Sequence, residues 1–173
     1  ALSVRLQILD DSHIDIAKSY NGLGICYLQK GKYSEALSYH ERALNIWLHS
    51  SSNAENEEIA KTYNYISNVY GSKGDQDKAL EYAQLALNIQ LSVLGEVHPK
   101  TTETYNQIGN YLSDKGDYTK SFTYLEKALN YRLEIFDANN PLVAESYSSI
   151  GMLHLRMADY HEALRCFLKA LAI

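Results

Sequence analysis

The chain has little of three things that often indicate a function: cysteine, proline and clustered positive charge. Its 173 residues include two cysteines and two prolines. The cysteines, Cys26 and Cys166, lie far apart in apolar helical context, which predicts buried free thiols rather than a disulfide framework and favours a reducing, cytoplasmic setting. The formal net charge is -5, and no basic block offsets it, so neither nucleic acid nor an anionic membrane surface is an expected partner. No apolar run approaches the length of about 18 residues that spans a bilayer, so no membrane insertion is expected either.

Signatures of catalysis and of cofactor binding are also missing. Gly22-Leu23-Gly24 resembles the start of a dinucleotide-binding loop, but the third glycine is absent and the segment follows a helical pattern. The six histidines include no pair three or four residues apart, the spacing that would place two metal ligands on one helical face. Adjacent carboxylates such as Glu57-Glu58 are expected in solvated loops rather than in an acid–base pair. The sequence therefore predicts no enzyme, no cofactor and no metal site.

What the chain does have is a long internal repeat. One alanine recurs at spacings of 42, 43, 42 and 42 residues, at Ala1, Ala43, Ala86, Ala128 and Ala170. The extra residue of the second spacing falls between Ser50 and Glu57. Within each period an apolar stripe at helical spacing leads to a turn residue, which is Gly31, Gly74, Gly116 or Ala158. Each period therefore predicts two helices joined by a tight turn, which glycine closes readily and Ala158 is expected to strain or reshape.

The columns of this repeat predict how the helices pack. Seven residues before each turn residue lies a small residue, which allows two helices to cross closely: Gly24, Ser67, Gly109 and Gly151. Directly after three of the turns an aspartate can cap the next helix: Asp75, Asp117 and Asp159. Twelve of the fifteen tyrosines also recur in repeated columns. Tyrosines that recur in this way predict packing between helices rather than stacking on nucleic-acid bases.

These residues resemble the tetratricopeptide repeat family, as in the segment YNGLGICYLQKGKYSEALSYHERAL. The common unit of that family has about 34 residues, so the longer period here adds one to two helical turns and a loop after the second alanine. Together with the junction LGEVHP, the longer unit resembles the repeats of kinesin light chains. The first helix departs from the Asn-Asn-Leu-Ala run of those proteins, with NGLG, NYIS, NQIG and SSIG at the corresponding positions. The resemblance implies an all-α fold, a right-handed superhelical solenoid of antiparallel helix pairs.

In this register the chain is expected to be a single array over residues 1–173. Residues 1–9 would be the second helix of a preceding repeat, with a first repeat at 10–51, a second at 52–94, a third at 95–136 and a truncated fourth at 137–173. The terminal helices would then expose apolar faces that neighbouring repeats normally cover. End-to-end self-association of the chain is therefore possible.

The face of the first helices that does not pack is the candidate binding site. Asparagine dominates this face although it is a mediocre helix former, and its carboxamide can pair with both the N–H and the C=O of a peptide main chain. The alternative is that the asparagines link neighbouring repeats. One turn earlier the charges divide between lysine and glutamate, which suits a peptide with an acidic end and a basic end. The predicted groove residues are Lys18, Asn21, Ile25, Lys61, Asn64, Asn68, Glu103, Asn106, Asn110, Glu145 and Met152.

The function that this pattern favours is a non-catalytic adaptor or scaffold, which holds an extended peptide segment of a partner protein in a concave groove. Arrays of the family that grip a C-terminal carboxylate carry a lysine followed four residues later by an asparagine. The corresponding pair here is Asn21 and Ile25, which argues against such a clamp. Two alternatives stay open: a ligand-sensing regulatory array attached to an effector domain, and an architectural array that self-associates.

Overall fold

The computed structural model describes residues 13–49 and 56–173. Its regular elements in these ranges are all α-helices. The helices are α2 (Ile14–Gln29), α3 (Tyr33–His49), α4 (Asn56–Lys73), α5 (Gln76–Val93), α6 (Pro99–Lys115), α7 (Tyr118–Ile135), α8 (Pro141–Arg156) and α9 (Tyr160–Leu171). The predicted helix at residues 1–9 lies outside the described residues. Contacts divide the chain into two units, residues 1–89 and 90–173, and each is described by itself below.

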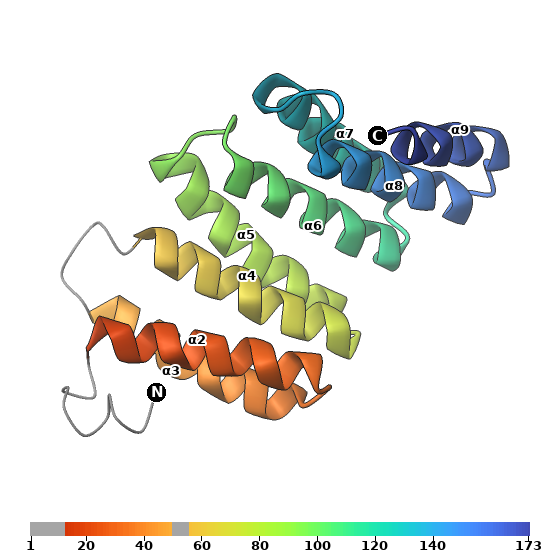
Figure 1. Cartoon of the computed structure of the whole chain (residues 1–173). Helices are drawn as coiled ribbons and strands as arrows, with labels where there is room; N and C mark the ends of the chain where they lie inside the picture. Colours follow the sequence, from red (N-terminus) through yellow and green to blue (C-terminus); the bar gives the residue numbers. More distant parts are fainter. Residues whose placement is uncertain (1–12, 50–55) are drawn as a thin grey trace. The chain divides into compact units, whose positions relative to one another are not determined.

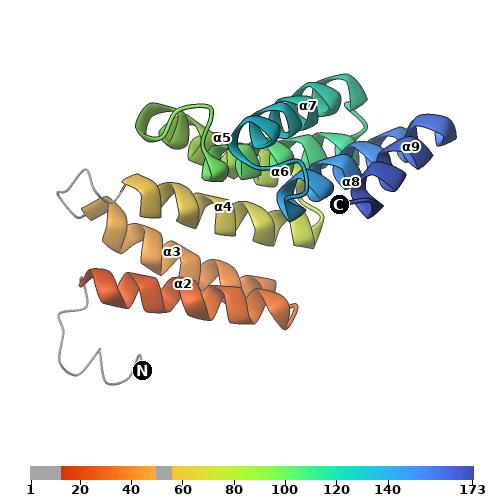
Figure 2. The same ribbon diagram turned by 45° about the horizontal axis from the view of Figure 1, so that its top comes forward.

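Each unit consists of antiparallel helix pairs. In the first unit α2 packs against α3, and α4 packs against both of them (Figure 1). In the second unit α6 pairs with α7 and α8 with α9, while α8 also contacts α6 and α7 (Figure 2). The second helices α3, α5 and α7 end at His49, Val93 and Ile135, six or seven residues beyond the alanine of the repeat. The all-α prediction and the extra helical turns of the long unit are thereby confirmed.

The turns within the pairs close as the sequence predicts. Gly116 has φ 85°, and the next residue, Asp117, donates its N–H to the carbonyl of Leu112 at 3.0 Å, which is the 6→1 bond of a Schellman turn. Ala158 adopts the same left-handed region with φ 59°, and its neighbour Asp159 donates its N–H to the carbonyl of His154 at 2.9 Å. The fourth turn therefore keeps the shape of the others at the cost of a strained alanine.

Polar side chains cap the N-termini of both the first and the second helices of the pairs. The carboxylates of Asp117 and Asp159 accept the N–H groups of Lys120 and Glu162, which confirms them as caps of α7 and α9. At the junctions between repeats, His13 and His98 cap α2 and α6, because each Nδ1 accepts the N–H of the residue two positions later. The recurrence of histidine at this junction thus has a local structural cause.

The small-residue column marks the closest approach of the helices in each pair. A β-carbon built on Gly24 would lie 2.5 Å from the ring of His40, and one built on Gly109 would lie 2.6 Å from the side chain of Leu125. The serine in this column, Ser67, uses the same proximity differently, since its hydroxyl donates to the carbonyl of Ala79 at 2.7 Å. The predicted helix crossing is confirmed.

Tyrosines pack across the same helix pairs. In the second repeat Tyr82 stacks on Tyr70 with ring centroids 5.6 Å apart, and it also contacts Tyr63 at 6.0 Å. In the first repeat Tyr39 makes the corresponding contacts with Tyr27 and Tyr20. These six tyrosines are thus packing residues, as predicted, whereas Tyr160, in another of the predicted columns, is 67% exposed.

The prediction for the cysteines is half right. Both are free thiols and Cys166 is buried, but Cys26 is exposed. Cys26 comes two residues after Gly24 on α2, and two residues turn an α-helix by roughly 200°. Its side chain therefore points away from the crossing with α3, a direction that apolar neighbours in the sequence do not indicate.

Two glycines of α2 allow a matched test of the crossing. Gly24→Ala should destabilise the protein by about 1–3 kcal/mol, because the added methyl group overlaps His40 at a packed site. Gly22→Ala should instead stabilise it by roughly 0.5–1 kcal/mol, because a β-carbon there meets nothing within 4 Å and alanine is the better helix former. Denaturant unfolding of the two variants measures both changes. Equal effects would show that the helices do not cross at Gly24.

A series of hydrogen bonds between buried polar side chains lies beside this crossing. His40 has no exposed surface and donates from Nδ1 to the Oδ1 of Asn21 at 2.9 Å. The Nδ2 of Asn21 donates to the hydroxyl of Thr62 at 2.8 Å, and that hydroxyl donates to the carbonyl of Glu58. This series of hydrogen bonds connects α3, α2 and α4, and it begins at a neutral histidine. Burial lowers the pKa of His40 from 6.5 to about 4.

Stability should therefore depend on pH through His40. The unfolded chain binds the imidazole proton below pH 6.5 and the folded chain only below about 4, so the free energy of unfolding should fall as the pH is lowered through this window. The loss should reach up to about 3 kcal/mol. Unfolding at pH 7 and pH 4.5 measures it, with His40→Leu as the control, since leucine occupies the same column at Leu125. A His40→Leu variant with an undiminished pH dependence would contradict the assignment.

Candidate functional site

The predicted groove residues lie on the first helices α2, α4, α6 and α8, but they differ in burial. The side chains of the charged members and of Met152 are exposed, and those of Ile25, Asn68 and Asn110 are half-buried. Three asparagines are buried: Asn21, Asn64 and Asn106. The face is thus not a uniform row of exposed asparagines.

Two of the buried asparagines bond to a neighbouring first helix in their own unit. Asn21 joins α2 to α4 through Thr62 and also holds His40. In the second unit Asn106 joins α6 to α8, because its Nδ2 donates to Oε1 of Glu145 at 3.0 Å. Links between neighbouring repeats, the alternative that the sequence left open, are therefore present at these two positions.

In the first unit the remaining face forms an open pocket between α2 and α4. Its volume is about 310 Å³. Four predicted groove residues contribute to it, namely Lys18, Asn21, Ile25 and Lys61, and sequence reasoning missed its other lining residues, Gly22, Glu58 and Tyr65. The two lysines are each paired with a carboxylate three residues earlier, Lys18 with Asp15 at 3.7 Å and Lys61 with Glu58 at 3.8 Å. The pocket combines ammonium groups with an aromatic ring.

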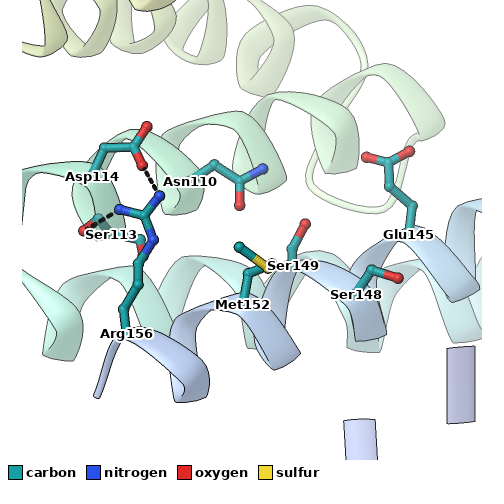
Figure 3. Close-up of a pocket in the computed structure, with 8 residues that line it drawn as sticks. All are labelled: Asn110, Ser113, Asp114, Glu145, Ser148, Ser149, Met152 and Arg156. Atoms are coloured by element: carbon teal, nitrogen blue, oxygen red, sulfur yellow. Dashed lines mark hydrogen bonds and ion pairs between the residues drawn. The ribbon is translucent and has the colours of Figure 1, made fainter. Parts of the chain in front are cut away.

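The second unit has a similar pocket of about 290 Å³ between α6 and α8. Three predicted groove residues line it: Asn110, Glu145 and Met152 (Figure 3). Glu145 lies at one end of the pocket, and at the other end Arg156 pairs with Asp114 and donates to the carbonyl of Ser113 (Figure 3). Ser148 and Ser149 lie between the two ends (Figure 3). The predicted residues Asn64, Asn68, Glu103 and Asn106 line neither pocket.

The two pockets use corresponding positions of the repeat. Three columns line both of them: Ile25 corresponds to Asn110, Lys61 to Glu145, and Tyr65 to Ser149. The backbone scaffold of the pocket is therefore repeated, whereas its charge and size change from one unit to the other.

A buried arginine behind the second pocket was not predicted from the sequence. Arg132 of α7 has no exposed surface, and its Nη1 donates to the carbonyl of Leu142 at 2.7 Å and to the hydroxyl of Ser146 at 2.8 Å. Its Nη2 reaches Oε1 of Glu145 at 3.5 Å. Arg132 stands in the same repeat column as Trp47 and Gln90, which are also buried. Its position in this column was the one feature of the sequence that could have indicated its burial.

The electrostatics of the second unit centre on two carboxylates in one column, Glu103 and Glu145. The side chain of Glu103 keeps exposed surface, but its pKa is raised, first because partial burial removes water from its carboxyl group and second because Glu145 adds a negative charge nearby. Arg132 opposes the rise. In the part of the chain that the structure describes, no cluster of three histidine, cysteine or acidic side chains could hold a metal ion. None of the helices described is long and apolar enough to cross a membrane.

Comparison with solved structures finds the same fold in other proteins. BtubC (BKLC) from P. vanneervenii superposes with a TM-score of 0.82 at 21% identity, over 98% of this chain and 67% of that one. A putative kinesin light chain from Podospora anserina with nearly identical TPR-like repeats gives a TM-score of 0.76 at 16% identity, over 99% of this chain and 81% of that one. Aspartyl phosphate phosphatase F from Bacillus subtilis gives 0.84 at 16% identity, over 99% of this chain but 43% of that one.

Comparison with curated proteins returned no match. The model of the tetratricopeptide repeat family matches residues 1–49, 15–92, 58–120 and 100–173, which together cover the whole chain. At the identities found, the solved structures establish the fold alone, and they include the TPR-like repeats of a putative kinesin light chain. The chain belongs to the tetratricopeptide repeat family.

Proposed function

We propose that this chain is a non-catalytic protein-interaction module, which binds an extended segment of a partner protein along the first-helix face. The observation that carries the proposal is the open pocket that recurs at corresponding positions in both units. A single pocket of this size would suit a small ligand equally well. Repetition of the pocket at corresponding junctions of the two units favours a ligand that is itself repetitive, as a peptide main chain is.

The spacing of helices and peptides is compatible with this arrangement. Packed helices lie about 8–10 Å apart, and an extended peptide advances about 3.3 Å per residue. About three peptide residues therefore span the distance between the two first helices that flank each pocket. The half-buried side chains Ile25 and Asn110 stand at corresponding points of the two pockets.

Filling one pocket tests the proposal. Peptides would first be selected from a random display library of nine-residue sequences with the whole chain as target. Ser149→Tyr should then weaken the binding of those peptides tenfold or more, about 1.4 kcal/mol, because the ring occupies the space that a peptide side chain needs. The fold accepts tyrosine in this column, where Tyr65 stands in the second repeat.

Calorimetry with the selected peptides measures the loss, and Thr119→Tyr on the exposed side of α7 is the matched control. Undiminished affinity in a folded Ser149→Tyr variant, or a library that yields no binding peptide, would refute the proposal.

A second candidate function, self-association, is favoured by one surface. Three leucines of α9 form an exposed stripe with spacings of four and three residues: Leu164 at 60%, Leu168 at 56% and Leu171 at 83% exposure. Leu168 stands in a column that is otherwise polar, with Glu41, Gln84 and Glu126 in the other repeats. Such a stripe is typical of a surface that a second helix covers.

If α9 mediates association, the sedimentation coefficient should rise with protein concentration in the wild-type chain. Leu168→Glu should abolish the rise, since it restores the charge that the column has elsewhere and places it within the apolar stripe. The substitution should leave the melting temperature nearly unchanged because the side chain is already exposed. A wild-type chain that stays monomeric up to millimolar concentration would exclude this candidate.

A further inference from the structure

The first-helix face of the second unit carries two carboxylates, and the part of the chain that the structure describes supplies one cation, Arg132, to balance both of them. Glu103 on α6 and Glu145 on α8 occupy the same column of neighbouring repeats, on helices that pack against each other. Within the described residues Glu103 makes no hydrogen bond or ion pair. Its pKa is raised, first by loss of water around the carboxyl group and second by the charge of Glu145, and this second effect is the one expected of two like charges on neighbouring helices.

The nearby arginine does not complete this pair. Arg132 is fully buried and directs Nη1 to Leu142 and Ser146. Its remaining contact, from Nη2, goes to Oε1 of Glu145, and the Nδ2 of Asn106 donates to that same oxygen. Inside the described part of the chain, Oε2 of Glu145 and both oxygens of Glu103 are therefore left without a donor. One buried cation faces two carboxylates.

The carboxamide of Asn106, which bonds to Glu145 through Nδ2, carries at its other end an acceptor without a donor in the described part of the chain. Asn106 is 3% exposed, and its Oδ1 finds no hydrogen-bond donor among the described residues. The orientation of the carboxamide is set by its other end, because Nδ2 must face the Glu145 carboxylate at 3.0 Å. A buried acceptor without a donor costs about 1–3 kcal/mol, and a small movement that brings it to an incoming N–H group would recover part of that cost. These groups share one unmet requirement, an N–H donor, and the two carboxylates favour a donor that carries positive charge.

The adjoining pocket offers room for the rest of such a donor. Met152 is 45% exposed and lies with Ser148 between the Glu145 end and the Arg156 end of the pocket (Figure 3). A thioether beside small hydroxyl side chains suits the methylene stem of a long side chain whose charged head lies elsewhere. At the far end Arg156 is already paired with Asp114, so a second cation is disfavoured there and its head is directed towards Glu145.

We propose that Glu103 and Glu145 bind the ammonium or guanidinium group of a lysine or arginine in the partner segment. This inference rests on the proposed function and specifies one residue of the ligand. In the first unit the same column carries Lys18 and Lys61, which would repel such a group. The basic residue is therefore recognised in the second unit alone, and it fixes the register of the bound segment.

The composition of selected peptides tests the inference. The same random nine-residue library would be selected in parallel with the wild-type chain, with Glu103→Gln combined with Glu145→Gln, and with Lys18→Gln combined with Lys61→Gln. Wild-type selections should enrich lysine or arginine at one position several-fold over the library frequency. The variant that lacks Glu103 and Glu145 should lose the enrichment, and the variant that lacks Lys18 and Lys61 should retain it.

Binding of individual peptides supplies the magnitude. Replacing the enriched lysine or arginine of a peptide with methionine should weaken binding to the wild-type chain by about tenfold or more and to the Glu103→Gln, Glu145→Gln chain by less than twofold, since only the first pair loses a charge-assisted bond. Parallel lysine and arginine versions of the peptide show which head group is preferred. Glu103→Gln alone should have about half the effect on the logarithm of the affinity. It removes no contact within the described chain, so its melting temperature should match that of the wild type.

The outcomes separate the two proposals. Peptides that bind without any basic preference, or whose basic preference survives in the glutamine variant, would overturn the carboxylate site and leave the interaction module standing. A failure of the wild-type chain to select any peptide would overturn both.

Discussion

The close approach of two helices at one small residue per repeat is the constraint on which the rest of the structure depends. At Gly24, Gly109 and Gly151 the facing side chain lies within 3 Å of where a β-carbon would be. In the third repeat the hydroxyl of Ser121 donates to the carbonyl of Gly109 at 2.8 Å, a bond that a larger residue at position 109 would prevent. With the pair fixed at this distance, the tyrosine rings and the apolar core can fill a space of constant width. The opposite side of the first helix then makes no contact with the second helix of its pair.

That opposite side still contributes to the structure, because it contacts neighbouring first helices. Asn21 and Asn106 are committed to bonds between neighbouring first helices, and those bonds set the width of the pockets that adjoin them. Asparagine serves this purpose because it offers a donor and an acceptor from one short side chain. In the function proposed above, recognition of a partner is assigned to the residues around them, above all the charged column and Asn110 and Met152 of the second pocket. Under that proposal, structure and binding use different positions of the same helical face.

The repeat register, the helix pairs, the turns and the crossing could be predicted from the sequence because each depends on local geometry that recurs four times. The small residue recurs in all four copies, and the turn glycine and the capping aspartate each recur in three. The pockets were harder to predict, because they lie between neighbouring first helices and depend on residues such as Ser149 and Arg156, whose identities are not repeated from copy to copy. The exposure of Cys26 and the burial of Arg132 required knowledge of which way each side chain points. Asn21 and Asn106 were correctly placed on the face, but propensity alone could not tell a bond to a neighbour from a bond to a ligand.

The fourth turn has a consequence for how such repeats are recognised. Ala158 holds a left-handed backbone conformation that the other turns reach with glycine, and the hydrogen bonds that close the turn are retained. The packing of α8 on α9 supplies enough energy to hold one strained alanine, so glycine at this place is a convenience and not a requirement of the architecture. A search pattern that demands the glycine would count three repeats in this chain and end the array one helix pair too early. Degenerate copies of long repeats are better detected by the spacing of their small residues than by the identity of any one of them.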